Sequence, residues 1–186
     1  MNVILVGLRG VGKTTLGRAL AARRDGRFVD LDDLTAAAAG HTRVAEAFVA
    51  LGESEFRRAE ASALRVVLGY RGQVVALGGG TPTAPGVERM LADARTAKLV
   101  RVIYLRATPA TLRARLAATD LRDRPSVTGE GALDEIGTLF ERRDGLYQSL
   151  ADVVLDVDGL VEGEVLERLV AATADLPRPP GQPASA

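Results

Sequence analysis

Five short apolar runs alternate with longer stretches of helical period along this chain of 186 residues. Runs rich in Val, Leu and Ile are typical of buried strands, and they lie at Val3–Val6, Phe28–Val29, Val74–Leu77, Leu99–Leu105 and Val153–Leu155. Apolar positions three and four residues apart predict helices over Lys13–Arg24, Glu53–Leu68, Pro109–Ala118, Leu133–Ser149 and Gly163–Leu176. This alternation predicts an α/β fold, a three-layer α/β/α sandwich with a five-stranded parallel sheet.

The segment between the first predicted strand and the first predicted helix, from Gly7 to Thr14, reads Gly-Leu-Arg-Gly-Val-Gly-Lys-Thr. It matches the P-loop pattern G-x-x-x-x-G-K-[ST] in the strand–loop–helix context that the pattern requires, whereas a structural turn would need no lysine. Backbone N–H groups would surround a triphosphate, Lys13 would reach its β and γ oxygens, and the Thr14 hydroxyl would bind Mg²⁺. The expected nucleotide-binding residues are Arg9, Gly10, Val11, Gly12, Lys13, Thr14 and Thr15.

Together with five strands, this motif predicts a P-loop NTPase fold of the nucleoside-monophosphate-kinase type, with ligands at the carboxyl ends of the strands. A polar segment at residues 119–131, which includes Arg124, lies between two predicted helices. We predict that it is a mobile lid over the nucleotide, although an ordinary surface loop has a similar composition. Residues 1–176 are expected to form one domain, and residues 177–186, rich in Pro, Ala, Gly and Ser, a disordered tail.

Composition narrows the classes of function. The formal charge is zero, with 24 basic and 24 acidic residues, which argues against a nucleic-acid surface built on bulk positive charge. The absence of cysteine excludes disulfides, thiolate metal sites and cysteine nucleophiles. Because the sequence has neither a leader pattern nor a long apolar stretch, we expect a cytoplasmic protein without a membrane partner. No apolar stripe is left for a second copy, so a monomer is expected.

A pair of carboxylates, Asp30 and Asp32, follows the second predicted strand. If the strand continues through them, alternation places both side chains on the same side. One could then hold the water shell of Mg²⁺ while the other accepts hydrogen bonds from a substrate hydroxyl. The alternative is a pair of helix-capping residues that lead into Asp33 and Leu34.

Three further clusters carry groups suited to anion or ligand binding. Residues Gly52–Arg58 would open a helix with acids in its first turn and two arginines behind them, although such a pair is also typical of a solvated face. Gly78–Gly80 follow the third predicted strand, where glycines permit a ligand to approach the backbone closely. Arg124 and Arg142–Arg143 supply planar guanidinium groups for bidentate oxyanion binding.

Taken in chain order, these motifs resemble the shikimate kinase family. The matching segments are Gly7–Thr14, Asp30-x-Asp32, Gly-Glu-x-Glu-Phe-Arg-Arg at 52–58, Gly78–Gly80, Arg124-Pro125 and Arg143-x-x-Leu146-Tyr147. Their combination is far more specific than the P-loop, which many unrelated NTPases share. The resemblance implies the reaction of ATP with shikimate to give ADP and shikimate 3-phosphate, a step towards chorismate and the aromatic amino acids, with ATP and Mg²⁺ as cofactors.

The resemblance also implies a role for each matched residue near the acceptor. Asp30 would help Thr14 to hold Mg²⁺. Asp32 would bind the shikimate hydroxyls and act as the base. Arg57 and Arg143 would together bind the shikimate carboxylate, and the pocket would be lined by the glycine triplet, Gly78, Gly79 and Gly80.

On the nucleotide side, the resemblance places Arg115 against adenine and brings Arg124 over the transferring phosphoryl group. Lys13 and Arg124 would neutralise charge in the transition state. The residues expected to be catalytic are therefore Lys13, Asp32 and Arg124.

Two rival functions stay open. Another small-molecule kinase, such as a gluconate kinase, would keep the P-loop and change the acceptor site, but Arg57 and Arg143 together with Asp32 favour a cyclic hydroxy acid. A nucleotide-binding module without transfer activity would bind ATP without turnover, and the intact Lys13 argues against it.

Overall fold

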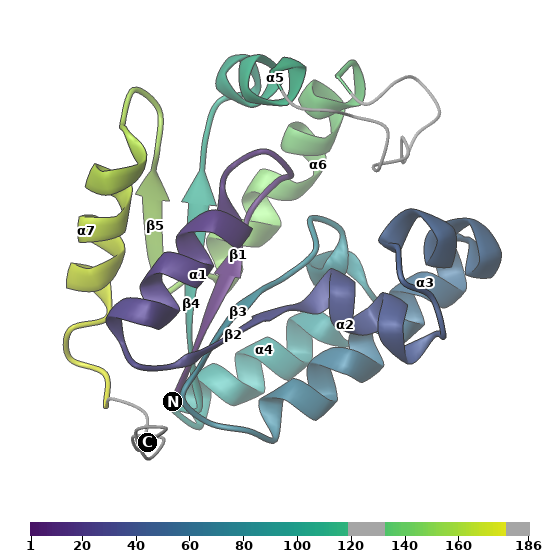
Figure 1. Ribbon diagram of the computed structural model, residues 1–186, viewed down its shortest axis with the longest axis horizontal. Helices are drawn as coiled ribbons and strands as arrows, with labels where there is room; N and C mark the ends of the chain where they lie inside the picture. The colour runs from purple at the N-terminus through teal and green to yellow at the C-terminus, as the bar shows by residue number, and fades with distance from the viewer. Residues whose placement is uncertain (119–132, 178–186) are drawn as a thin grey trace.

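Parallel strands and helices alternate along the computed structural model, which describes residues 1–118 and 133–177 (Figure 1). The elements in chain order are β1 (Asn2–Val6), α1 (Lys13–Arg23), β2 (Arg27–Asp30), α2 (Leu31–Ala38), α3 (Val44–Leu68), β3 (Gln73–Ala76), the 3₁₀ turn η1 (Thr81–Thr83), α4 (Val87–Thr96), β4 (Val100–Arg106), α5 (Pro109–Ala117), α6 (Glu135–Leu150), β5 (Val153–Asp156) and α7 (Glu162–Ala172). The predicted lid falls outside the described residues, as does all of the predicted tail except Pro177.

The five strands form one parallel sheet in the order β2-β3-β1-β4-β5, so β1 lies at its centre. Every residue of β1 and β3 is buried, which is why both strands read as continuous apolar or uncharged runs rather than as alternating ones. Helices α1 and α7 pack together on one face of the sheet, while α4 and α6 contact the other (Figure 1). The predicted three-layer α/β/α sandwich with a five-stranded parallel sheet is confirmed.

Parallel strands bring the loops that carry the candidate motifs to one edge. The P-loop follows β1, Asp30 ends β2, and Gly78–Gly80 follow β3. The helix after β4 begins as its sequence indicates, since the Thr108 side chain caps α5 and Pro109 occupies its first position. The carboxyl edge of the sheet therefore gathers the residues from which a site can be built.

The expectation that the second strand continues through Asp32 is wrong. The strand ends at Asp30, α2 begins at Leu31, and the Asp30 side chain accepts a hydrogen bond from the backbone N–H of Asp32 at 3.2 Å. Asp30 therefore caps α2, as the alternative has it, while Asp32 lies in the first turn of that helix. Both aspartates still line the same pocket.

Two other helices differ from the predicted pattern. Helix α3 begins at Val44 and is broken at Gly52, whose φ of 72° and ψ of 163° are not helical, so the predicted start at Glu53 marks its second half. Helix α4 has no counterpart among the predicted helices. Within the described residues, no helix has the length and apolar character needed to cross a membrane.

Candidate active site

The P-loop connects the central strand β1 to the first turn of α1. Gly10 and Gly12 adopt positive φ values of 82° and 100°, which glycine tolerates and which curl the backbone. The Lys13 Nζ donates hydrogen bonds across this curl to the carbonyl oxygens of Gly7 at 2.8 Å and Leu8 at 3.0 Å. The lysine ammonium is thus held over a loop at a helix N-terminus, an arrangement that attracts anions.

A hydroxyl and a carboxylate meet beside the lysine. The Thr14 Oγ1 donates a hydrogen bond to the Asp30 Oδ2 at 2.8 Å, joining the start of α1 to the end of β2. Within the described residues, no group of three or more His, Cys, Asp or Glu side chains could hold a metal ion. One hydroxyl and one carboxylate suit a hard cation that keeps most of its ligands as water or phosphate oxygens.

Asp32 lies in the same pocket in an environment that favours its protonated form. Burial raises the pKa of the Asp32 carboxyl to about 7, and the nearby carboxylates of Glu60 and Asp30 add to this shift. The positive charges of Lys13 and Arg57 oppose it. A carboxylate with a pKa near neutrality can take a proton from a hydroxyl and release it again at the pH of the cell.

Arg57, in the second half of α3, is fixed by a carboxylate one helical turn away. Its Nη1 donates to the Glu60 Oε2 at 2.6 Å, and its Nη2 lies 3.4 Å from the Glu53 Oε1. Glu60 is fully buried and also accepts a hydrogen bond from the Thr81 hydroxyl. The guanidinium is therefore held in one orientation at the pocket wall rather than on a solvated face.

The glycine triplet leaves space that these side chains fill. A Cβ on Gly80 would collide with the Arg57 guanidinium, and a Cβ on Gly78 would collide with a carboxylate oxygen of Asp32. The Gly79 carbonyl accepts hydrogen bonds from the Arg143 Nη1 at 2.9 Å and from the Tyr147 hydroxyl, both on α6. Glycine is needed here for close approach.

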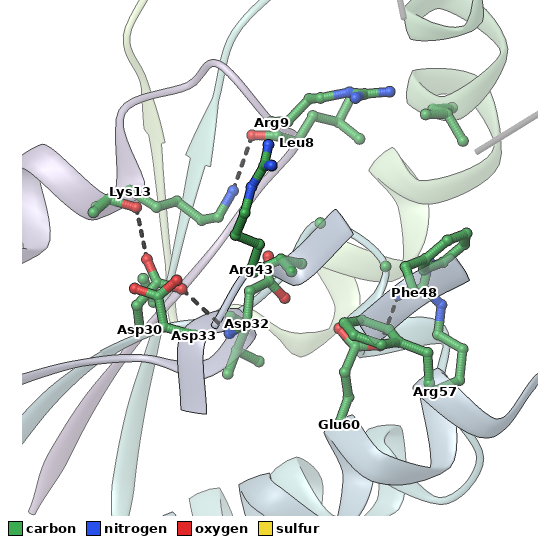
Figure 2. A pocket seen from close by; sticks show the side chains of 18 of the residues that line it. Leu8, Arg9, Lys13, Asp30, Asp32, Asp33, Arg43, Phe48, Arg57 and Glu60 are labelled. Atoms are coloured by element: carbon green, nitrogen blue, oxygen red, sulfur yellow. Dashed lines mark hydrogen bonds and ion pairs between the residues drawn. The ribbon is translucent and has the colours of Figure 1, made fainter. Parts of the chain in front are cut away.

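The P-loop residues and the residues around Arg57 line one pocket of about 420 Å³ (Figure 2). The predicted residues that line it are Arg9, Lys13, Thr14, Asp30, Asp32, Arg57, Gly79, Gly80 and Arg143. Its volume suits a small ligand. The lining residues that were not predicted from the sequence are Leu8, Asp33, Thr42, Arg43, Val44, Phe48, Phe56, Glu60, Ala76, Leu77 and Leu139. The spacing of Glu60 from Arg57, three residues along one helix, was the signal that could have found it.

A second pocket of about 270 Å³ lies beside the P-loop, lined by Gly10, Val11, Gly12, Thr15, Leu16, Arg115, Leu160, Glu162 and Val165. Arg115 reaches it from α5 and donates to the carbonyl oxygens of Val11 at 3.4 Å and Val157 at 3.3 Å. The predicted nucleotide residues are therefore shared between two adjoining pockets. Arg124 lies outside the described residues.

A P-loop at the centre of a parallel sheet, next to a pocket with a carboxylate and two arginines, defines a P-loop kinase of small molecules. A family model described as shikimate kinase matches residues 9–174. The chain therefore belongs to the shikimate kinase family. Membership makes it a phosphotransferase that uses ATP and acts on a small-molecule substrate.

Individual relatives agree with this assignment over nearly the whole chain. The chain is 37% identical to the shikimate kinase of Chromobacterium violaceum, with 96% of this chain and 93% of that one covered. It is 39% identical to the shikimate kinase of Symbiobacterium thermophilum, with 91% and 96% covered.

Solved structures show the same architecture. The shikimate kinase of Acinetobacter baumannii in complex with shikimate superimposes with a TM-score of 0.81 at 25% identity, covering 95% of each chain. That of Bacteroides thetaiotaomicron gives a TM-score of 0.76 at 26% identity, covering 94% of this chain and 98% of that chain. The predicted P-loop fold of the nucleoside-monophosphate-kinase type is confirmed.

Proposed function

We propose that this protein transfers the γ-phosphoryl group of ATP to the 3-hydroxyl of shikimate, with Mg²⁺, to give ADP and shikimate 3-phosphate. One observation carries the proposal: Asp32, Arg57 and Arg143 line the same pocket as Lys13 and Thr14. A ring with one carboxylate and several hydroxyls is complementary to two guanidinium groups and one carboxylate. The relative from Acinetobacter baumannii was solved in complex with shikimate, which supports the choice of acceptor.

On the nucleotide side, the backbone N–H groups of the P-loop would bind the phosphates, and Lys13 would leave its carbonyl partners to bind a γ-phosphoryl oxygen. Thr14 and Asp30 have the oxygen donors that Mg²⁺ prefers, and their 2.8 Å contact places both donors at one point. When bound, Mg²⁺ supplies neutralisation of charge on the phosphates. Arg115, beside the second pocket, would pack against adenine.

On the acceptor side, Arg57 and Arg143 would bind the shikimate carboxylate, and Gly79 and Gly80 would admit the ring close to the backbone. Asp32 would accept hydrogen bonds from the hydroxyls and orient the 3-hydroxyl towards the phosphorus atom.

In the transfer, a bond forms between the 3-oxygen and the γ-phosphorus while the bond from that phosphorus to the β–γ bridging oxygen breaks. The hydroxyl proton passes to Asp32, and ADP leaves with the bridging oxygen. Lys13 stabilises the charge that accumulates on the phosphoryl oxygens. We also propose that Arg124, which is outside the described residues, adds positive charge at this stage.

The test is release of ADP by the purified protein with ATP and Mg²⁺, measured alone, with shikimate and with gluconate. We expect shikimate to stimulate release strongly and gluconate to have no effect. Stimulation by gluconate alone would show that shikimate is not the acceptor. The role of the P-loop would be kept, but the roles proposed for Arg57 and Arg143 would be wrong. Binding of ATP without stimulation by either acid would contradict the transfer reaction.

A further inference from the structure

A buried ion pair joins the P-loop to the first turn of α6. Arg9, the third residue of the loop, contacts the carboxylate of Glu135, the first residue of the helix. The Glu135 side chain has no exposed surface, and that of Arg9 is 16% exposed. In Figure 2 the Arg9 side chain extends away from Lys13 towards the far side of the pocket. The P-loop is therefore held through the side chain of Arg9 as well as through its backbone.

The same helix also holds the acceptor side. Further along α6, Arg143 and Tyr147 both donate to the Gly79 carbonyl. The two loops adjoin, because the backbone nitrogen of Arg9 lies 3.5 Å from the point where a Cβ of Gly79 would be. Helix α6 thus fixes the P-loop at its N-terminal end and the glycine loop at its middle.

The buried pair between Arg9 and Glu135 is better explained as a contact that orients Arg9 than as one that stabilises the fold. Burial of two charges costs solvation free energy that their attraction repays only in part, so such a pair adds little net stability compared with apolar side chains. Glu135 is the first residue of α6, where the positive end of the helix dipole attracts negative charge. A fully buried carboxylate in contact with a guanidinium holds it in one place and one orientation.

The P-loop needs such a constraint. Gly10 and Gly12 give the backbone access to many conformations, yet the N–H groups must converge on one phosphate. A Cβ on Gly10 would collide with the Leu116 side chain, so α5 restrains the loop on one side. Glu135 on α6 restrains Arg9, the residue next to Gly10 in the loop. Less conformational freedom remains to be lost when the nucleotide binds.

We propose that Glu135 is a positioning residue for nucleotide binding, which acts through Arg9 to hold the P-loop in the conformation that accepts phosphates. The proposal rests on the proposed function only in taking the nucleotide to be ATP. Glu135 itself does not touch the nucleotide, and its effect requires Arg9.

The first experiment measures the Kd of Mg²⁺-ADP by calorimetry for the wild type and for Glu135→Gln, which keeps the shape of the side chain and removes its charge. We expect the Kd to rise about tenfold, as for other residues that orient a ligand-binding group. The KM for ATP should rise by a larger factor than kcat falls, with little change in the KM for shikimate. The matched control is Glu55→Gln, which breaks the exposed pair with Arg58 on α3 and should leave the Kd unchanged.

The second experiment tests whether Glu135 acts through Arg9. A double-mutant cycle compares the wild type, Arg9→Ala, Glu135→Gln and the double variant. Glu135→Gln should weaken ADP binding in the wild-type background and have no further effect in the Arg9→Ala background. An equal effect in both backgrounds would overturn the proposal. So would an unchanged ADP Kd in Glu135→Gln, or a rise confined to the KM for shikimate.

A third variant covers the case in which Glu135→Gln does not fold. The double substitution Arg9→Met with Glu135→Leu replaces the buried charges by apolar groups of similar size, and it should fold yet bind ADP about tenfold more weakly than the wild type. Full ADP affinity in that variant would overturn the proposal. Because ADP binding needs no acceptor, failure of the wild type to phosphorylate shikimate would refute the proposed function alone.

Discussion

The two sides of the pocket are built in different ways. The nucleotide side is formed mainly by consecutive residues, Gly7–Thr14, whose contacts come from the backbone and one ammonium group. The acceptor side is assembled from α2, α3, the loop after β3 and α6, and its contacts come from side chains. A phosphate site can therefore be encoded locally, whereas recognition of a small acid depends on how distant elements pack.

Charged side chains on both sides of the pocket are held by neighbouring groups. On the acceptor side Arg57 donates to Glu60, and the pKa of Asp32 is raised by burial and by Glu60 and lowered by Lys13. On the nucleotide side Lys13 contacts two carbonyl oxygens. We expect changes at Lys13 and Asp32, which would take part in the transfer itself, to lower kcat most, and changes at Arg57 to weaken shikimate binding most.

The largest effect is expected for Lys13→Ala, which removes the ammonium group that would stabilise the transferring phosphoryl group. We expect kcat to fall by about 10⁴-fold, the size of the contribution to kcat that a positive group beside the transferring phosphoryl oxygens makes. Steady-state ADP release with saturating shikimate measures it. Turnover within tenfold of the wild type would contradict the assignment of the nucleotide side, and circular dichroism checks that the variant is folded.

Asp32→Asn should have the next largest effect, a fall in kcat of about 10²- to 10³-fold, because the amide cannot accept the hydroxyl proton. In the wild type, kcat/KM for shikimate should rise about tenfold between pH 6 and pH 8, as the carboxyl with its pKa of about 7 ionises in the free enzyme. The variant should show no such rise. A wild-type profile that is flat over this range would exclude Asp32 as the base.

The same shift predicts a change in stability with pH. The folded pKa of Asp32 lies above its ordinary value of 3.8, so the folded chain holds a proton that the unfolded chain releases. The stability from this group is complete below about pH 4 and is lost as the pH rises through about 7. Asp32→Asn should thus have a higher Tm than the wild type at pH 8, with a smaller difference at pH 5, as thermal unfolding at both values would measure.

Arg57→Ala should separate binding from transfer. Loss of a charge-assisted contact costs about 1.5–3 kcal/mol, so the KM for shikimate should rise about 10- to 100-fold while the KM for ATP changes little. The buried Glu60 would lose its positively charged partner in this variant and keep only the Thr81 hydroxyl, so the Tm should fall as well. A KM for shikimate equal to that of the wild type would remove Arg57 from the acceptor site.

Gly80→Ala tests the steric part of the acceptor side. Its Cβ would collide with the Arg57 guanidinium, which must then move from the position set by Glu60. We expect about a tenfold rise in the KM for shikimate, at the low end of the effect of losing Arg57 itself. Kinetic constants for both substrates provide the measurement. If the KM for ATP rises instead, Gly80 serves the nucleotide side and the division between the two sides does not hold there.

The same difference between local and distant encoding explains what sequence could predict. Residues Gly7–Thr14 were found because strand, loop and helix are adjacent in the chain, and β1 and β3 because buried strands read as unbroken apolar runs. The predicted placement of Asp32 was wrong because α2 begins directly after β2, with no loop between them. The chain changes from strand to helix at the bond between Asp30 and Leu31. Helix α4 was missed although its buried residues Val87, Leu91 and Ala94 recur at helical spacing, so the sequence did carry a signal for it.

Contacts between distant elements left no pattern in the sequence. Neither the hydrogen bond from Arg143 to Gly79, 64 residues apart, nor the pair between Arg9 and Glu135 follows from local spacing. The roles of Arg57 and Arg143 came only from the resemblance to a family, because two arginines on separate helices are equally typical of solvated faces. The acceptor side is therefore the part of the molecule where prediction from sequence alone depends most on known relatives.

The smallest effect is expected on α6, the helix that serves both sides, at a residue that serves neither. Gly145 is exposed, and a Cβ there would meet nothing within 4 Å. Because glycine loses more backbone freedom than alanine in a helix, Gly145→Ala should stabilise the fold by about 0.5–1 kcal/mol. A rise in Tm of about 1–4 °C by calorimetry, with both KM values unchanged, would show that only the inner face of α6 is committed to the site. A loss of activity with a raised Tm would instead mean that both sides require α6 to bend.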